Sequence, residues 1–155
     1  MTTPEDRLEA QGITLPHAPP PAASYVPWVR TGDLVMTAGQ IPVSGGVPVS
    51  TGLLGQELTV QQGQAAARQC AINVLAQLKS AVGELSNVRR LVKVTVFVAS
   101  TTDFHEQHLV ANGASDLLGQ ILGDDVGPHA RSAVGVAALP LNVPVEVEAI
   151  AEVVG

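Results

Sequence analysis

An arginine near the C-terminus, Arg131, lies in a sequence context that favours anion binding. It begins a run that is typical of a β-strand, and strand alternation places it on one face with His129, Ala133 and Gly135. The small side chains beside it leave room for the guanidinium to bind a carboxylate through two parallel hydrogen bonds. From the pattern alone, a surface or interface salt bridge is the more common role for such an arginine.

Two carboxylates, Glu146 and Glu148, follow in the last predicted strand. Because they are two residues apart, they lie on the same face. A carboxylate near Arg131 could position a water molecule or deprotonate it as a general base. The alternative is that both carboxylates are solvated or paired with arginines, and for Glu148 this alternative is the stronger.

The remaining candidate residues predict neither a metal site nor a bound cofactor. His105 and His108 are three residues apart on a predicted helix, but no third ligand is indicated. Cys70 lies on an apolar helical stripe and is expected to be inert core. Glycine-rich phosphate-binding motifs and the nucleophile elbow of serine hydrolases are absent from the sequence.

The elements that would position these residues follow the order ββ-α-β-α-ββ. The longest helix shows apolar residues at every fourth position, with Thr59 as its N-cap and Gly83 at its end. Hairpins and helical crossovers together favour an α+β fold, a mixed β-sheet with two helices on one face. The predicted elements are strands at Tyr25–Arg30 and Leu34–Ile41, a helix at Val60–Val82, a strand at Leu91–Ala99, a helix at Asp103–Leu122, and strands at Arg131–Leu139 and Val143–Val154.

The composition indicates one domain and excludes several kinds of partner. Residues 1–23 begin with a short predicted helical turn at Pro4–Ala10 and continue through several prolines, which predict an extended lead-in to a single domain at residues 24–155. The net charge of -6 and the scattered basic residues argue against nucleic acid. No run resembles a signal peptide or a membrane span, so a cytoplasmic location is expected by default. Only 14% of residues are charged, which favours apolar surface buried between subunits.

Three segments resemble the RidA/YjgF family, also labelled endoribonuclease L-PSP. The similarity runs over about residues 24–152, and the third segment is the most specific. These segments are Gly32–Pro42, Val92–Val98 followed by Asp103-Phe104, and Ala130–Val134 followed by Leu139-Pro140 and Val145–Ala151.

The resemblance implies a chorismate-mutase-like homotrimer with small-molecule clefts between its subunits. The implied activity is that of a hydrolase, an imine deaminase that converts reactive 2-imino and 2-enamino acids into 2-oxo acids and ammonia without a metal or cofactor. It assigns carboxylate binding to Arg131 and base catalysis to Glu146. It also implies that Tyr25, the only tyrosine, and Gly39 shape the pocket. An ordinary half-buried aromatic residue and a β-bulge are the respective alternatives.

This sequence also departs from the best-known members of the family. Ala133 replaces a common cysteine, and His129 replaces a common proline, which here is displaced to Pro128. His129 could touch the ligand, although a structural hydrogen bond is the more usual role for a lone histidine. A longer, distinct branch is therefore indicated. A protein that binds or senses small carboxylates without turnover remains open, and an endoribonuclease is disfavoured by the acidic charge.

Overall fold

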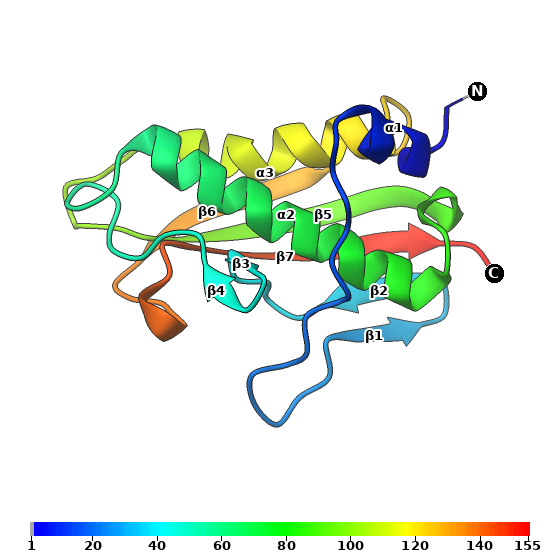
Figure 1. The fold of residues 1–155 in the computed structure, drawn as a ribbon, viewed down its shortest axis with the longest axis horizontal. Helices are drawn as coiled ribbons and strands as arrows, with labels where there is room; N and C mark the ends of the chain where they lie inside the picture. Colours follow the sequence, from blue (N-terminus) through cyan, green and yellow to red (C-terminus); the bar gives the residue numbers. More distant parts are fainter. Residues whose placement is uncertain (1) are drawn as a thin grey trace.

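The computed structural model describes residues 2–155 as a sheet covered on one face by helices (Figure 1). The main sheet has five strands in the order β1-β2-β7-β5-β6, and β3 and β4 form a separate small hairpin. The elements are α1 (Pro4–Ala10), β1 (Trp28–Thr31), β2 (Leu34–Thr37), β3 (Val43–Ser44), β4 (Val47–Pro48), α2 (Val60–Val82), β5 (Val88–Ala99), α3 (Gln107–Leu122), β6 (Ala130–Val136) and β7 (Val145–Val153).

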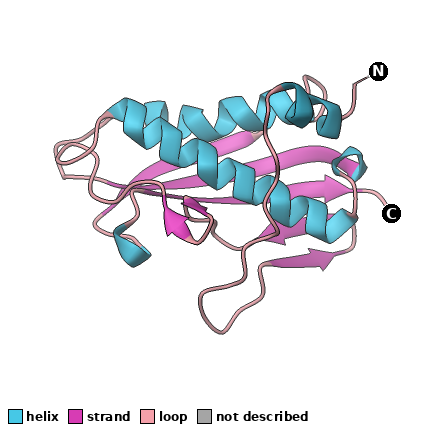
Figure 2. Cartoon of the chain, viewed as in Figure 1, coloured by secondary structure: helices cyan, strands magenta, loops and turns pink. Residues whose placement is uncertain are grey.

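The pairing of the strands confirms the predicted α+β class with a mixed sheet. Strands β5 and β6 are parallel, whereas the β1–β2, β2–β7 and β5–β7 pairs are antiparallel. The parallel pair requires a crossover connection, and α3 provides it. Figure 2 shows α2 and α3 lying side by side on one face of the strands, as the sequence predicts. The core lies between these two helices and the sheet.

Helix α2 has the bounds predicted from the sequence, because the signals at both of its ends are local. The side chain of Thr59 accepts a hydrogen bond from the Gln62 backbone, and the Gln62 side chain accepts one from the Thr59 backbone. This reciprocal capping box satisfies two donors at the helix start. Gly83, with a φ of 84°, ends the helix in a conformation that glycine adopts without steric cost.

Helix α3 begins later than predicted, at Gln107 rather than Asp103. The Thr101 hydroxyl donates to Asp103 at 2.6 Å, and the Phe104 backbone N–H donates to the Thr101 carbonyl. This local turn competes with the first helical turn, a usual effect of serine, threonine and aspartate near a helix start.

Several strands are shorter than predicted, and β1 and β6 are shorter because the strands they pair with end. Strand β1 begins at Trp28 rather than Tyr25, and β6 ends at Val136 rather than Leu139. Val136 pairs with Ala99, the last residue of β5, so the residues beyond it have no strand to pair with. Strand β2 ends at Thr37, although Gln40 still forms an isolated bridge to Val147.

The contact between α2 and α3 depends on a glycine in the middle of α3. A Cβ atom at Gly113 would overlap the backbone oxygen of Gln64 in α2. Glycine has a low helix propensity, but at this position it lets the two helices approach closely.

Gly113→Ala is expected to lower the free energy of unfolding by about 3 kcal/mol, because backbone atoms have little room to move away. Gly119→Ala is the matched control in the same helix, since a Cβ there meets nothing within 4 Å. Better helix propensity should make this control neutral, or more stable by about 0.5–1 kcal/mol. Urea titrations of both variants measure the difference. Equal stabilities would show that the helices do not need the glycine.

The sheet face away from the helices carries apolar side chains that the protomer leaves exposed. In β7, Val145, Val147 and Ala149 are buried under the helices, so the alternate residues lie on the opposite face. Several large apolar residues of the strands are exposed there: Val29 is 51% exposed, Leu34 37%, Met36 37% and Val134 44%.

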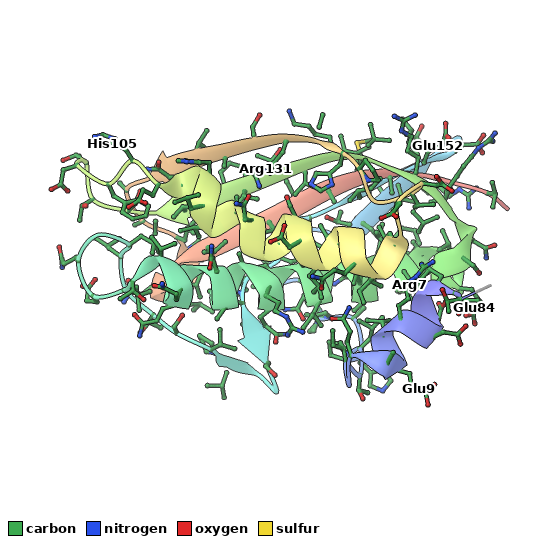
Figure 3. All side chains as sticks on the ribbon, turned by 90° about the horizontal axis from the view of Figure 1, so that it is seen from above. Arg7, Glu9, Glu84, His105, Arg131 and Glu152 are labelled. Carbon is green, nitrogen blue, oxygen red and sulfur yellow. The ribbon has the colours of Figure 1, made fainter. Side chains whose placement is uncertain are left out.

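The N-terminal segment packs onto the rest of the molecule through α1. Leu8 joins the hydrophobic core, and the Arg7 guanidinium donates to the Ile121 carbonyl at 2.9 Å, near the end of α3. Figure 3 shows Arg7 beside the final turn of α3. Within residues 2–155, no helix has the length and apolar character needed to cross a membrane.

Candidate functional site

Glu146 lies on the open face of the sheet, against the backbone of Gly39. A Cβ atom at Gly39 would lie 2.7 Å from Cδ and 2.8 Å from Oε1 of Glu146. The space left by the missing side chain is therefore occupied by the carboxylate. Glu148 is on the same face, as the sequence predicts, because Glu146 pairs with Phe97 and Glu148 with Thr95 in β5.

The surroundings of Glu146 favour its protonated form. Partial burial raises the pKa of this carboxyl group, and the nearby charge of Glu148 raises it further. A carboxylate with a raised pKa is a better proton acceptor, which is the property that a general base near neutral pH needs. Desolvation and a like charge together are a frequent mark of functional carboxylates.

Gly39→Ala tests the contact between Gly39 and Glu146 directly. Gly39 does not have a positive φ, so an alanine fits the backbone and only the flexible Glu146 side chain must move. We expect the melting temperature to change little and turnover to fall by about tenfold or more, because a displacement of about 1 Å at a reacting group can cost 10²-fold. Thermal melts and steady-state kinetics on a 2-imino acid, the substrate class that the family resemblance implies, measure the two effects. Full turnover in the alanine variant would place the reacting carboxylate elsewhere.

Tyr25 lies in the loop that leads into β1. Its side chain is 47% exposed, and its hydroxyl accepts a hydrogen bond from the Ala22 backbone at 3.2 Å. The Ala38 N–H donates to the Pro27 carbonyl at 2.8 Å, so the chain two residues after Tyr25 lies beside the residue that precedes Gly39. Tyr25 and Gly39 therefore belong to the same region of the protomer, and the Tyr25 ring is available to a ligand or a neighbouring subunit.

Arg131 points toward α3, on the helix-covered side of the sheet (Figure 3). Its Nη1 donates to Asn112 Oδ1 at 2.9 Å and to Ser115 Oγ at 3.2 Å, and its Nη2 donates to the His108 carbonyl at 3.2 Å. Ala133, two residues along β6, is on the same face and packs against the core. The predicted alternation along this strand is confirmed.

The positive charge of Arg131 is not neutralised within the described chain. The ion pairs among residues 2–155 join Arg30 to Asp33, Lys79 to Glu5 and Arg89 to Glu152. All three acceptors of Arg131 are neutral, and an arginine carries five N–H donors. The Nε donor and one Nη2 donor are therefore left without a partner in residues 2–155. A salt bridge, the alternative reading of Arg131, is not found within this protomer.

His129 uses both of its ring nitrogens, one toward the backbone of Gly127 and one toward Ser115, which also contacts Arg131. Its Nδ1 lies 2.7 Å from the Gly127 carbonyl oxygen, and its Nε2 lies 2.9 Å from Ser115 Oγ. His129 and Arg131 line one groove of about 630 Å³ along the second half of α3 and the loop that follows. Ser115 and Asn112 were not identified as site residues from the sequence. The only local signal was the presence of small polar residues inside a helix that otherwise buries apolar ones.

Arg131 and Glu146 do not meet within one protomer. They lie on opposite faces of the sheet, and two strand spacings separate them through the Glu146–Phe97 and Phe97–Val134 pairs. With strands about 4.8 Å apart and a rise of about 3.3 Å per residue, their Cα atoms are roughly 14 Å apart. Within a single subunit, Glu146 and Glu148 therefore do not lie beside Arg131.

Cys70 has the core position that the sequence predicts. Cys70 is fully buried, and burial raises the pKa of its thiol, so it behaves as core. Among residues 2–155, no group of three or more histidine, cysteine, aspartate or glutamate side chains is arranged to hold a metal ion.

Comparison with known proteins identifies the family. The family model described as Endoribonuclease L-PSP matches residues 15–153. Protein TCP17 of Trypanosoma cruzi is 50% identical over 145 residues, which are 94% of this chain and 91% of that protein. The 2-iminobutanoate/2-iminopropanoate deaminase of Salmonella typhimurium is 33% identical over 145 residues, 90% of this chain and 94% of that enzyme.

Solved structures agree with the sequence comparison. The protein Atu1372 of Agrobacterium tumefaciens is 48% identical with a TM-score of 0.91, covering 97% of this chain and 92% of that one. The YjgF gene product of E. coli is 33% identical with a TM-score of 0.64, covering 88% of this chain and 93% of that one. The chain therefore belongs to the RidA/YjgF family, whose family model is described as Endoribonuclease L-PSP.

Proposed function

We propose that this protein hydrolyses reactive 2-imino and 2-enamino acids to 2-oxo acids and ammonia, in clefts between the subunits of a homotrimer. The observation that carries the proposal is the half-buried guanidinium of Arg131, which has two free N–H donors and no carboxylate partner within residues 2–155. Such a group is suited to the carboxylate that every 2-imino acid carries. A relative with 33% identity is named an imine deaminase, which supports this substrate class.

The reaction needs only water and a proton acceptor. Arg131 holds the substrate carboxylate, and Glu146 of the partner subunit removes a proton from a water molecule as its oxygen attacks the imine carbon. The C=N bond becomes a C–N bond, and the nitrogen takes up a proton. The tetrahedral adduct then loses ammonia: the hydroxyl proton passes to the amino nitrogen, the C–N bond breaks, and the hydroxyl oxygen forms the C=O bond. An enamine first accepts a proton on its β-carbon, which converts it to the imine.

Positioning can supply much of the rate because imines already hydrolyse in water. Tyr25 and the backbone at Gly39 line the end of the cleft near Glu146, and His129 lies at the end near Arg131. Ala133 offers no nucleophile, so the attacking group in this branch is water. The proposed reaction uses no metal ion and no cofactor. A chelator should therefore leave turnover unchanged, and restoration of chelator-inhibited turnover by one divalent ion would contradict the proposal.

A second and third copy of the chain are the proposed occupants of the exposed sheet face. The apolar residues Val29, Leu34, Met36 and Val134 would be buried there. Glu146 is on this face and Arg131 is at the edge strand β6, so packing of one subunit's edge against the next subunit's open face can bring the two residues together. The family resemblance implies a trimer of this kind.

The trimer is tested by its mass. Light scattering is expected to give about 48 kDa, three times the protomer mass of 15.9 kDa. Met36→Asp should dissociate the assembly, because an unpaired charge cannot be buried in an apolar interface without a large cost. Val49→Asp is a matched control, since Val49 is also exposed but lies outside the strands of the main sheet. A wild-type monomer at micromolar concentration would remove the proposed shared site.

Imine hydrolysis is tested with substrates generated in situ. An amino-acid oxidase converts a panel of amino acids to imines, semicarbazide traps the imine that survives, and 2-oxo acid formation is followed with and without the protein. We expect faster imine loss, with a rate that depends on the side chain. Binding of the product 2-oxobutanoate without faster hydrolysis would indicate a carboxylate-binding protein. RNA cleavage at two salt concentrations, without imine hydrolysis, would indicate a ribonuclease.

A further inference from the structure

The hydrogen bonds around His129 form a chain with one defined direction. The Gly127 carbonyl can only accept a hydrogen bond, so the Nδ1 atom of His129, 2.7 Å away, must carry the proton. In the neutral ring, Nε2 is then an acceptor. Ser115 Oγ is 2.9 Å from Nε2, so the serine hydroxyl donates to it. The orientation of Ser115 is therefore determined by a backbone carbonyl on the far side of the imidazole.

This orientation leaves the Ser115 oxygen free to accept a hydrogen bond from Arg131. Because the serine hydroxyl proton points at His129, a lone pair of Oγ faces the arginine, and Arg131 Nη1 donates to it at 3.2 Å. The second Nη1 proton is taken by Asn112 Oδ1 at 2.9 Å. Asn112 and Ser115 are three residues apart on α3 and thus lie on one side of the helix. Both protons of Nη1 are consequently bound by the protein.

We infer that Ser115 and His129 are positioning residues that fix the guanidinium of Arg131 so that its Nε edge remains free for the substrate carboxylate. This inference rests on the proposed function, because it names what orients the carboxylate-binding group. A free arginine side chain is flexible, and binding would have to immobilise it. Here the protein has already paired one side of the guanidinium, which lowers the entropic cost of binding.

The groove in the same region is compatible with this role. The hydrogen-bonded chain from Gly127 through His129 and Ser115 to Arg131 is called the relay below. His129, Ser115 and Arg131 all line the groove, so the relay borders a space of about 630 Å³ that a small ligand can enter.

Three single variants and one double variant separate a positioning role from a structural one. Ser115→Ala removes the hydroxyl that joins His129 to Arg131, and His129→Leu removes the acceptor that orients this hydroxyl. Each should raise KM, and weaken binding of 2-oxobutanoate in calorimetry, by about tenfold, with kcat changed less than about threefold. His129→Gln can present its Oε1 to Ser115 and should restore most of the affinity. The Ser115→Ala/His129→Leu double variant should lose no more than either single variant, because both break one chain.

The control is His105→Ala. The side chain of His105 is exposed, and Arg131 bonds instead to Asn112, Ser115 and the backbone of residue 108, so KM and affinity should stay at the wild-type value. Nitrogen NMR of the wild type should show His129 protonated on Nδ1 and unprotonated on Nε2. The opposite tautomer would overturn the relay. Lower melting temperatures in Ser115→Ala and His129→Leu with unchanged KM and affinity would show that the cluster is only structural.

The two proposals fail in different ways. If the wild type does not hydrolyse imines but its affinity for 2-oxobutanoate responds to the variants as described, the relay holds and the proposed reaction is wrong. If the wild type hydrolyses imines and both single variants bind and turn over normally, the reaction holds and the relay is wrong.

Discussion

Arg131→Ala is expected to lower kcat/KM for imine hydrolysis by about 30-fold to several thousand-fold, with the trimer intact. A carboxylate that leaves water for a cleft needs a charged, forked partner, and loss of such a buried partner costs about 2–5 kcal/mol. At about 1.4 kcal/mol per factor of ten, that range gives the expected loss. Steady-state kinetics on the wild type and the variant measure it.

Arg131→Lys should restore only part of the activity, because an ammonium group cannot form two parallel hydrogen bonds. It also cannot satisfy Asn112, Ser115 and the His108 carbonyl together in the geometry of the guanidinium. Sizing and thermal melts are the controls. If Arg131→Ala dissociates or unfolds, the arginine is structural and the carboxylate site has to be sought elsewhere. A folded, fully active variant would also place the substrate at a different site.

Glu146→Gln is expected to lower kcat by about 10²–10⁴-fold with a small change in KM, because it keeps the shape of the side chain and removes the proton acceptor. The raised pKa of Glu146 predicts that wild-type kcat falls as the pH drops through a value above 4.5. A pH–rate profile measures this acid limb. Undiminished turnover by the glutamine variant would exclude Glu146 as the base.

Glu148→Gln is the matched variant for the pH profile. The charge of Glu148 contributes to the raised pKa of Glu146, so its removal should lower that pKa. The acid limb of the rate profile is then expected to move to lower pH while kcat at neutral pH remains within a few-fold of the wild type. An acid limb that does not move would mean that another group controls it.

The same raised pKa predicts an effect on stability. A carboxyl group with a higher pKa in the folded state binds protons more tightly there than in the unfolded chain. Its stabilising contribution is complete below the unfolded pKa and is lost as the pH rises through the folded pKa. Glu146→Gln should therefore gain in melting temperature relative to the wild type when the pH is raised from 4 to 7. Thermal melts across this range test the sign, and a relative loss would contradict it.

The sequence alone determined the fold class and the longest helix, and it supplied the candidate residues of the proposed site. Helix α2 could be predicted to the residue because its capping box and its terminal glycine are local features. The faces of β6 and β7 followed from strand alternation, which needs no knowledge of neighbours. The start of α3 could not be predicted in the same way, since the hydrogen bond between Thr101 and Asp103 replaces the first helical turn.

Only the tertiary structure decided how the candidate residues are combined. Alternation gives the two faces of each strand, but which face of β6 matches which face of β7 depends on their common pairing with β5. That pairing places Arg131 and Glu146 on opposite sides of the sheet. Each proposed site therefore combines Arg131 of one subunit with Glu146 of another. The contacts of Arg131 with Asn112 and Ser115 likewise depend on the crossover of α3 beside β6. Such long-range contacts arise from packing between distant segments, and no local sequence pattern encodes them.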